Sequence, residues 1–279
     1  MTKRKTLSDC LRDFIYPFVL LLTKTRVKFK IHIENAPSLL PNKQSIFAVN
    51  HTNSFDLPVA AKAVYKKLKK RCVVIAGKQN LWRIDRLFFF LNSVIWVDRK
   101  NKNETSVSKE LLIDSIRNGH DVIWFPEGTW NMTDNLLMLP MKWGIVGVAA
   151  ATGSQIMPVV LEYDRPTMIC HVSFGAPIAP DKDANKADAI RELRDSMSTL
   201  RWELWEKQEQ LKRADVDCEK LRTDMYYALE EYPPLDWDYE QTVIFKPHTS
   251  PQEAFSHLED LIPCMDNAFL FNKRYSNVR

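Results

Sequence analysis

A histidine and an aspartate five positions apart carry the clearest chemical signal in this sequence. His51 follows an apolar stretch at 45–49 that is typical of a short buried strand, and Asp56 precedes a predicted helix at 58–68. A tight turn from strand to helix can bring the two side chains together. A carboxylate that accepts from one imidazole nitrogen leaves the other nitrogen able to take a proton. A loop histidine beside a helix-capping aspartate would give the same pattern.

Cations follow two further predicted strands. Lys78 comes after the stretch at 72–76, and Arg99 comes after the stretch at 94–97. Because functional groups of α/β folds gather at the carboxyl ends of strands, both cations could lie near His51 and bind an anionic group such as phosphate. Basic residues in such positions are also ordinary surface.

A fourth polar segment follows the predicted strand at 122–125. Glu127 and Thr129 are suited to binding a polar part of a substrate, and Gly128 between them allows the backbone to approach closely. We therefore expect this segment to border the same edge of the sheet as His51.

Taken in order, these segments resemble the glycerolipid acyltransferases of the lysophosphatidic acid acyltransferase type. His51 and Asp56 match the H-x-x-x-x-D motif of that family, and residues 125–129 match its F-P-E-G-T motif. The first motif alone is unspecific, whereas the two together at this spacing are characteristic. The resemblance covers residues 40–165.

Two other family motifs are matched more loosely. Residues 97–99 end an apolar run with D-R, and Lys78 matches the lysine of an upstream K-x-E-L segment, although Asn80 stands where the family has glutamate. Residues 157–159 match an apolar-Pro-apolar strand. The order of all four motifs along the chain is that of the family.

The resemblance implies an O-acyltransferase of phospholipid biosynthesis. It would move a fatty acyl group from acyl-CoA or acyl-carrier protein to the hydroxyl of a lysophospholipid, with 1-acylglycerol-3-phosphate giving phosphatidic acid. His51 would deprotonate that hydroxyl, and Asp56 would orient His51. No metal and no cofactor beyond the thioester substrate is implied. The implied substrate-binding residues are Lys78, Arg99, Glu127, Gly128, Thr129, Asn53 and Trp130.

Trp130 departs from the family pattern, because the F-P-E-G-T motif normally continues with a phosphate-binding arginine. An indole ring cannot neutralise phosphate, although it can stack on a sugar or pack against an acyl chain. Either another cation binds the phosphate, or the acceptor is a glycolipid or lipoamino acid. A non-catalytic lipid-binding protein on the same scaffold is a further alternative, against which the intact His51–Asp56 pair argues.

The alternation of short apolar stretches with helical patterns predicts an α/β fold, in which a central, largely buried mixed sheet is flanked by helices. Pro158 predicts that its strand is an edge strand or that the strand starts there. Strands are predicted at 27–33, 45–49, 72–76, 94–97, 122–125, 156–161 and 168–174, and helices at 7–23, 58–68, 81–91, 106–117 and 141–151.

We expect three regions along the chain. Residues 1–35 would form an amphipathic, membrane-contacting segment with an interfacial helix, and residues 36–180 the acyltransferase domain. Residues 181–279 would form a mainly helical C-terminal extension, whose charged pattern includes the pair Trp202 and Trp205. At helical spacing, this pair is typical of core packing.

The N-terminal region suits an anionic membrane surface. Residues 14–22 are apolar, yet they are about half as long as the ~20 residues that a spanning helix needs. Basic residues flank them, as in a helix that lies in the membrane interface; a helix packed on the protein's own core is the alternative. Residues 1–100 hold 20 Lys/Arg and 6 Asp/Glu. Six of the basic residues lie between 62 and 71 and could face anionic lipid, an acyl-carrier protein or only solvent.

The cysteines indicate the cellular compartment, and the lack of other motifs excludes several classes of protein. The five cysteines show neither metal-ligand nor paired spacing, which indicates free thiols in a reducing compartment. We therefore expect a peripheral membrane protein on the cytoplasmic face. No nucleotide-binding glycine loop, no G-x-S-x-G elbow and no nucleic-acid-binding module is recognised, so nucleic acid is not an expected partner.

Overall fold

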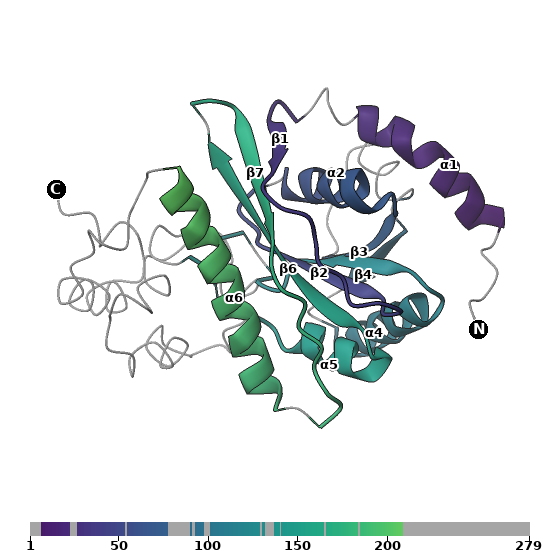
Figure 1. Ribbon diagram of the computed structural model, residues 1–279. Helices are drawn as coiled ribbons and strands as arrows, with labels where there is room; N and C mark the ends of the chain where they lie inside the picture. The colour runs from purple at the N-terminus through teal and green to yellow at the C-terminus, as the bar shows by residue number, and fades with distance from the viewer. Residues whose placement is uncertain are drawn as a thin grey trace.

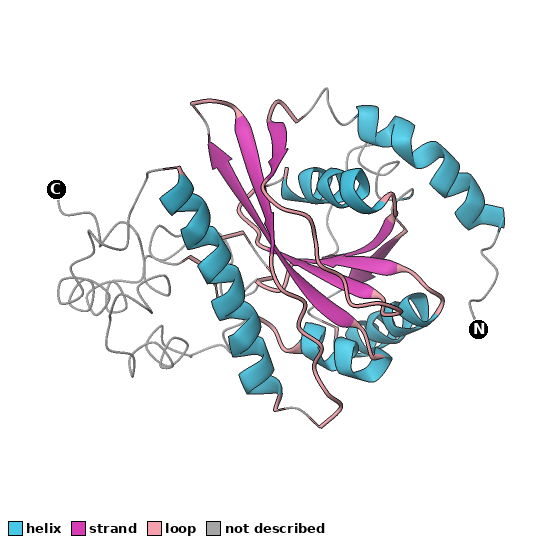
Figure 2. Cartoon of the chain, viewed as in Figure 1, coloured by secondary structure: helices cyan, strands magenta, loops and turns pink. Residues whose placement is uncertain are grey.

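A seven-stranded sheet lies between two layers of helices (Figures 1 and 2). The computed structural model describes residues 7–22, 27–53, 55–77, 90, 93–97, 101–128, 130–131, 137–139, 141–164, 166–183 and 185–208, and all structural observations concern this part of the chain. The elements in chain order are α1 (Leu7–Leu22), β1 (Lys30–Ile33), β2 (Ser45–Val49), α2 (Asp56–Leu68), β3 (Cys72–Gly77), β4 (Val94–Val97), α4 (Lys102–Arg117), β5 (Asp121–Trp124), α5 (Gly144–Thr152), β6 (Gln155–Asp164), β7 (Ile169–Phe174) and α6 (Lys186–Lys207).

The strand order is β1-β7-β6-β2-β5-β3-β4. All neighbours pair in parallel except β6 and β7, which are antiparallel. The predicted mixed α/β sheet is therefore confirmed. β2 lies in the middle of the sheet and is buried along its whole length, so the residues that follow it leave from the protein's centre.

Each face of the sheet has its own hydrophobic core. The helices α1 and α2 cover one face, and α2 approaches closely because its inner side is built from small residues such as Ala60 and Ala63. The helices α4, α5 and α6 cover the other face, where Leu112, Ile145 and Trp202 are fully buried. Burial on both sides explains why the central strands read as continuous apolar runs.

Most strand and helix predictions agree with the structure to within a few residues, and a side-chain cap explains the difference at the start of α4. The helix predicted at 106–117 begins at Lys102, because the Asn101 side chain accepts from the backbone N–H of Asn103 (3.1 Å) and Glu104 (3.3 Å). The helix predicted at 81–91 lies outside the described residues, apart from Phe90.

The prediction that Pro158 marks an edge strand or a strand start is wrong. β6 lies between β7 and β2, and Pro158 pairs with Ala48 of β2. Regular pairing with β7 begins only at Val159, and the Pro158 carbonyl accepts from Gly175 N (2.9 Å), just past the end of β7. Because the N–H and C=O of a strand residue point to the same side, the missing N–H of Pro158 falls where the β7 ladder has stopped.

The segment expected as a C-terminal extension begins with a helix that belongs to the domain core. α6 packs against β6, and Leu193, Met197 and Trp202 are buried in the same cluster as residues of α4 and α5. Trp205 lies beside Trp202 in this core, with ring centroids 6.0 Å apart. The expected boundary at residue 180 therefore precedes a helix that shares its core with the sheet.

The first helix is amphipathic and docks on the α2 side of the sheet. Tyr16 and Leu20 are buried, and Tyr16 meets Tyr65 of α2 edge-on. Arg71 binds Asp9 (3.2 Å) and Asp13 (2.9 Å), which fixes the helix to the start of β3. The opposite face is apolar and exposed: Leu7, Leu11, Phe14, Phe18 and Leu21. Among the described residues, no helix is long and apolar enough to cross a membrane.

Candidate active site

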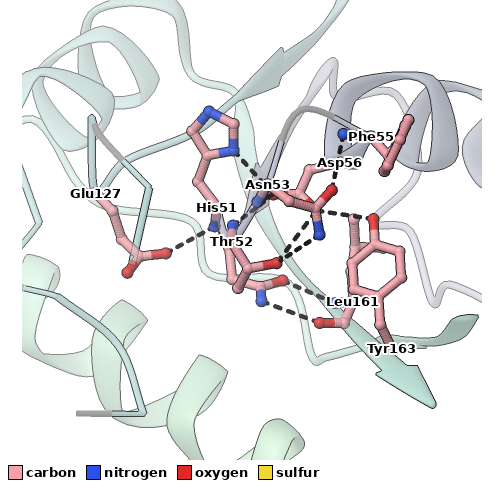
Figure 3. Close-up of polar contacts among 9 residues, drawn as sticks. His51, Thr52, Asn53, Phe55, Asp56, Glu127, Leu161 and Tyr163 are labelled. Atoms are coloured by element: carbon pink, nitrogen blue, oxygen red, sulfur yellow. Dashed lines mark hydrogen bonds and ion pairs between the residues drawn. The ribbon is translucent and has the colours of Figure 1, made fainter. Parts of the chain in front are cut away.

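The His51 and Asp56 side chains meet at the carboxyl end of β2, as their spacing predicted. His51 Nδ1 lies 2.9 Å from Asp56 Oδ2 (Figure 3). Asp56 is the first residue of α2 and is fully buried, whereas the His51 side chain is 21% exposed. The chain turns from strand to helix within residues 50–56, which gives the short return path that this contact requires.

This contact defines which imidazole nitrogen is basic. An ionised carboxylate only accepts, so His51 Nδ1 carries the proton that it donates to Asp56, and Nε2 holds the lone pair. No hydrogen bond to Nε2 occurs within the described residues, and this nitrogen points away from the carboxylate (Figure 3). The arrangement can accept a proton at Nε2 and stabilise the resulting imidazolium through Asp56.

Asp56 is itself held in place by several hydrogen-bond donors. The backbone N–H groups of Thr52 and Asn53 donate to Oδ2, and the Tyr163 hydroxyl donates to Oδ1 at 2.8 Å. The carboxylate also lies at the N-terminus of α2, where the helix dipole favours negative charge. Asp56 thus anchors the turn and orients His51 at once.

Tyr163 was not singled out from the sequence. It lies in β6, far along the chain from Asp56, and burial beside that carboxylate raises the pKa of its hydroxyl far above the usual value. The hydroxyl therefore stays protonated as a donor to Asp56. The only sequence signal was its place near the end of a strand that neighbours β2.

Asn53 takes part in the turn. Its side-chain oxygen accepts from Phe55 N (2.8 Å), and its amide nitrogen donates to Thr52 Oγ1 (3.2 Å). Asn50, just before His51, spans to β6 by donating to the Leu161 carbonyl (3.1 Å) and accepting from its N–H (2.7 Å). Asn50 thus extends the β2–β6 pairing to the residue before the histidine, whereas Asn53 holds the turn that follows it.

The His51 ring is held between two aromatic rings. It stacks on Phe125, with centroids 4.3 Å apart, and meets Trp130 edge-on at 5.9 Å. Trp130 is 39% exposed, so part of the residue that contacts the imidazole reaches the surface. Aromatic walls of this kind suit an apolar chain next to the basic nitrogen.

Glu127 lies beside His51, as expected, but backbone N–H groups occupy its carboxylate. The carboxylate is fully buried, Oε1 accepts from His51 N (2.8 Å), and Oε2 accepts from Leu139 N (2.7 Å). Asn131 N donates to the His51 carbonyl (2.6 Å), so the backbone of His51 is bonded on both sides. Glu127 and Asp56 reach the histidine loop from opposite sides (Figure 3). With both oxygens occupied by backbone, Glu127 acts on the site through the position of His51.

Burial raises the pKa of Glu127 from 4.5 to about 7, although the hydrogen bonds from Leu139 and His51 and the charge of Arg201 oppose this rise. The folded protein therefore binds this proton more tightly than the unfolded chain. The stability that protonation supplies is complete below pH ~4.5 and is lost as the pH rises through ~7.

Between about pH 5 and about pH 8, we expect the free energy of unfolding of the native protein to fall by about 2 kcal/mol more than that of Glu127→Gln. The reason is that the carboxyl group of Glu127 titrates in this range, whereas the amide of glutamine does not. Denaturant unfolding at several pH values measures this difference. Parallel curves for the two proteins would contradict it.

Gly128 and Lys142 lie side by side next to this buried carboxylate. Gly128 has a positive φ of 76°, a conformation that favours glycine. A Cβ at this position would lie 3.4 Å from Lys142 Cε, so the lysine stem crosses the open face of the turn. Lys142 N donates to the Pro126 carbonyl (3.0 Å), which ties the two segments together. Lys142 is a cation beside the F-P-E-G-T motif that sequence reasoning missed.

Three expected substrate-binding residues, Lys78, Arg99 and Thr129, lie outside the described residues. Their roles stay predictions. Within the part of the chain that the structure describes, no cluster of histidine, cysteine or acidic side chains could hold a metal ion.

Comparisons with known proteins agree on one family. Residues 28–162 match the family model described as Acyltransferase. The chain is 38% identical over 72 residues to a lyso-ornithine lipid O-acyltransferase of Rhodobacter capsulatus, covering 24% of this chain and 25% of that protein. It is 28% identical over 125 residues to a 1-acyl-sn-glycerol-3-phosphate acyltransferase of Saccharomyces cerevisiae, covering 44% and 40%. The chain thus spans less than half the length of these relatives.

A solved structure supports the fold. The 1-acyl-sn-glycerophosphate acyltransferase PlsC from Thermotoga maritima superposes with a TM-score of 0.55 at 15% identity, over 69% of this chain and 80% of that chain. Identity at this level bears on the arrangement of helices and strands only.

Proposed function

We propose that this chain is an O-acyltransferase of the glycerolipid type, which moves a fatty acyl group from acyl-CoA or acyl-carrier protein to the hydroxyl of a lysophospholipid; its match to the Acyltransferase family model over residues 28–162 supports this. The observation that carries this proposal is the partly exposed His51 imidazole, which contacts buried Asp56 through Nδ1 at 2.9 Å and so leaves Nε2 to act as the base, between the rings of Phe125 and Trp130.

In the proposed reaction the acceptor hydroxyl gives its proton to His51 Nε2 as its oxygen attacks the thioester carbonyl. The tetrahedral intermediate then collapses, the C–S bond breaks, and the leaving thiolate takes the proton back from the imidazolium. Asp56 stabilises that imidazolium. No acyl-enzyme forms. The histidine alone carries the proton from the oxygen of the acceptor hydroxyl to the sulfur of the leaving thiolate.

1-Acylglycerol-3-phosphate is the acceptor that we propose first. Its phosphate needs a cation, and Trp130 occupies the family's arginine position. Lys142, whose stem crosses Gly128, is a cation in the right neighbourhood, and Lys78 and Arg99 remain proposed phosphate ligands. A lipoamino acid acceptor is the second candidate, because the Rhodobacter relative is named for a lyso-ornithine lipid and because Trp130 cannot neutralise phosphate.

A panel of acceptors tests the choice. The protein is incubated with labelled palmitoyl-CoA or palmitoyl-carrier protein and with lysophosphatidic acid, other lysophospholipids, a lyso-ornithine lipid or a lysoglycolipid. Labelled phosphatidic acid as the main product supports the first acceptor, and a Lys142→Gln variant should then raise KM for it. If the main product is instead the lipid formed by acylation of the lyso-ornithine lipid, that lipid is the acceptor, and the proposed reaction chemistry stays the same.

We further propose that α1 holds the protein peripherally on a membrane. Five apolar side chains, from Leu7 to Leu21, lie exposed on one face of this helix. Beside it, the end of α2 exposes Lys66, Lys67 and Lys69, whereas Lys70 pairs with Asp121 and Arg71 with α1. An apolar face flanked by lysines suits insertion into an anionic lipid surface.

Replacing Phe14 and Phe18 by Gln should weaken binding to vesicles of phosphatidylcholine and phosphatidylglycerol at least about tenfold, because each phenyl ring loses its burial in lipid. Co-sedimentation measures this. Val107 and Leu111, an exposed apolar pair on α4, provide the matched control when replaced by Gln. Equal binding by the α1 variant, the α4 control and the native protein would overturn the membrane role of α1.

A further inference from the structure

We propose that Arg201, on α6, is a positioning residue for His51, which it reaches through residues 137–139 and Glu127. This inference rests on the acyl transfer proposed above, because it assigns an effect on that reaction to a helix that lies outside the family-matched residues 28–162.

Arg201 joins three parts of the molecule. Its Nε binds the Glu162 carboxylate of β6 at 2.9 Å, and its Nη1 donates to the Leu137 carbonyl at 2.6 Å. Its guanidinium also lies over the Trp205 ring, 5.3 Å from the centroid. The side chain is only 15% exposed, so these contacts hold it in one orientation. A planar, rigid fork of donors is pre-organised for these contacts and for stacking on the ring, whereas an ammonium on a flexible stem is not.

From Leu137 the hydrogen bonds continue to His51 by two routes. Leu139 N donates to Glu127, whose other oxygen accepts from His51 N. The Leu137 carbonyl also lies 3.4 Å from the Asn131 amide, and Asn131 N donates to the His51 carbonyl. Arg201 therefore fixes the segment that contacts Glu127 and Asn131, the two residues that bond to the N–H and the carbonyl of His51. Residues 137–139 are fully buried, so water cannot replace the arginine at the Leu137 carbonyl without opening the core.

Arg201 also contributes charge near Glu127. Arg194 and Arg201 from α6 favour the ionised carboxylate, and Asp56 from α2 disfavours it, while Lys142 lies beside the adjoining Gly128. The ionised form accepts more strongly at both oxygens, from Leu139 and from His51, whereas a protonated oxygen is a weaker acceptor and also needs an acceptor for its own proton. Loss of Arg201 should therefore weaken the hold on His51 in two ways, through geometry and through protonation of Glu127.

The test compares three variants of the full chain in the acyl-transfer assay. Arg201→Met removes both the fork and the charge, Arg201→Lys keeps the charge, and Arg191→Met removes an exposed arginine of the same helix that pairs with Asp188. We expect Arg201→Met to lower kcat about 10²-fold with little change in KM, because a displaced base loses alignment with the hydroxyl. The acid limb of its pH profile should move up by about one pH unit.

Arg201→Lys should also lose kcat but keep the acid limb of the native protein, and Arg191→Met should match the native protein in both. Arg201 variants that match Arg191→Met in kcat and in pH profile would overturn the inference.

A second readout needs no substrate. The Nδ1 proton shared by His51 and Asp56 should give a downfield NMR signal, assigned by its loss in Asp56→Asn. We expect it to persist in Arg191→Met and to broaden or shift in folded Arg201→Met; an unchanged signal would contradict the positioning role. If this signal responds while the native protein transfers no acyl group, the proposed function fails and the positioning of His51 by Arg201 stands.

Discussion

Replacing His51 by Ala should lower kcat for acyl transfer by about 10³-fold or more, with the fold intact. The side chain supplies the nitrogen that we propose as the general base, next to the rings of Phe125 and Trp130. Loss of a general base typically costs ~10²–10⁴-fold. Steady-state kinetics with a thioester donor and a lysophospholipid measures the effect.

Folding of this variant serves as the control. The backbone of His51 keeps its bonds to Glu127 and Asn131, so the unfolding midpoint of His51→Ala should stay close to that of the native protein. A folded variant with native kcat would remove His51 from the mechanism and leave the histidine as a turn residue.

Asp56→Asn should be almost as damaging, with kcat lowered by about 10²–10⁴-fold. An amide can donate to His51 Nδ1, which would move the imidazole proton to Nε2 and leave that nitrogen unable to act as a base. The variant should also be less stable, because the carboxylate accepts from Thr52, Asn53 and Tyr163 in a fully buried position.

Tyr163→Phe separates the two effects. It removes one donor to Asp56 Oδ1 and leaves the His51 contact at Oδ2 in place. We expect a loss of stability with a fall in kcat of no more than about tenfold, since the tautomer is unchanged. Should Asp56→Asn and Tyr163→Phe reduce kcat equally, Asp56 would be a structural anchor and its tautomer role would be wrong.

The sequence could predict what local patterns determine. The strand at 45–49 and the helix after it follow from apolar runs and their flanks, and the spacing of His51 and Asp56 fits a turn that brings them into contact. The alternation of elements predicted the mixed α/β sheet. These features depend on residues that are close in the chain, so they can be predicted from a single sequence.

The features that the sequence did not predict depend on contacts between segments that are distant in the chain. Glu127 has the residue type of a substrate ligand, yet the fold buries it against two backbone N–H groups, one of them 76 positions away. Tyr163 and Arg201 carry no local motif, because their partners Asp56 and Leu137 come near only in the folded chain. Pro158 predicted an edge strand or a strand start because the sequence does not show that β7 stops pairing with β6 at Val159.

Glu127 has opposite effects on stability and on the position of His51, depending on whether it is protonated. Ionised Glu127 holds both Leu139 and His51, whereas protonated Glu127 makes the folded state more stable. The arginines of α6 favour the ionised form, which is the one that positions the base. A helix beyond the matched motifs thus takes part in the chemistry that we propose for them.

The most direct test is to follow both products of the native protein in one reaction. Palmitoyl-CoA and lysophosphatidic acid are mixed with the protein and vesicles, free thiol is measured, and the lipid product is identified by mass spectrometry, with His51→Ala alongside. We predict phosphatidic acid and free thiol in equal amounts, both dependent on His51. Thiol released with free palmitate would indicate hydrolysis, and neither product from any donor or acceptor of the panel would contradict acyl transfer by this chain.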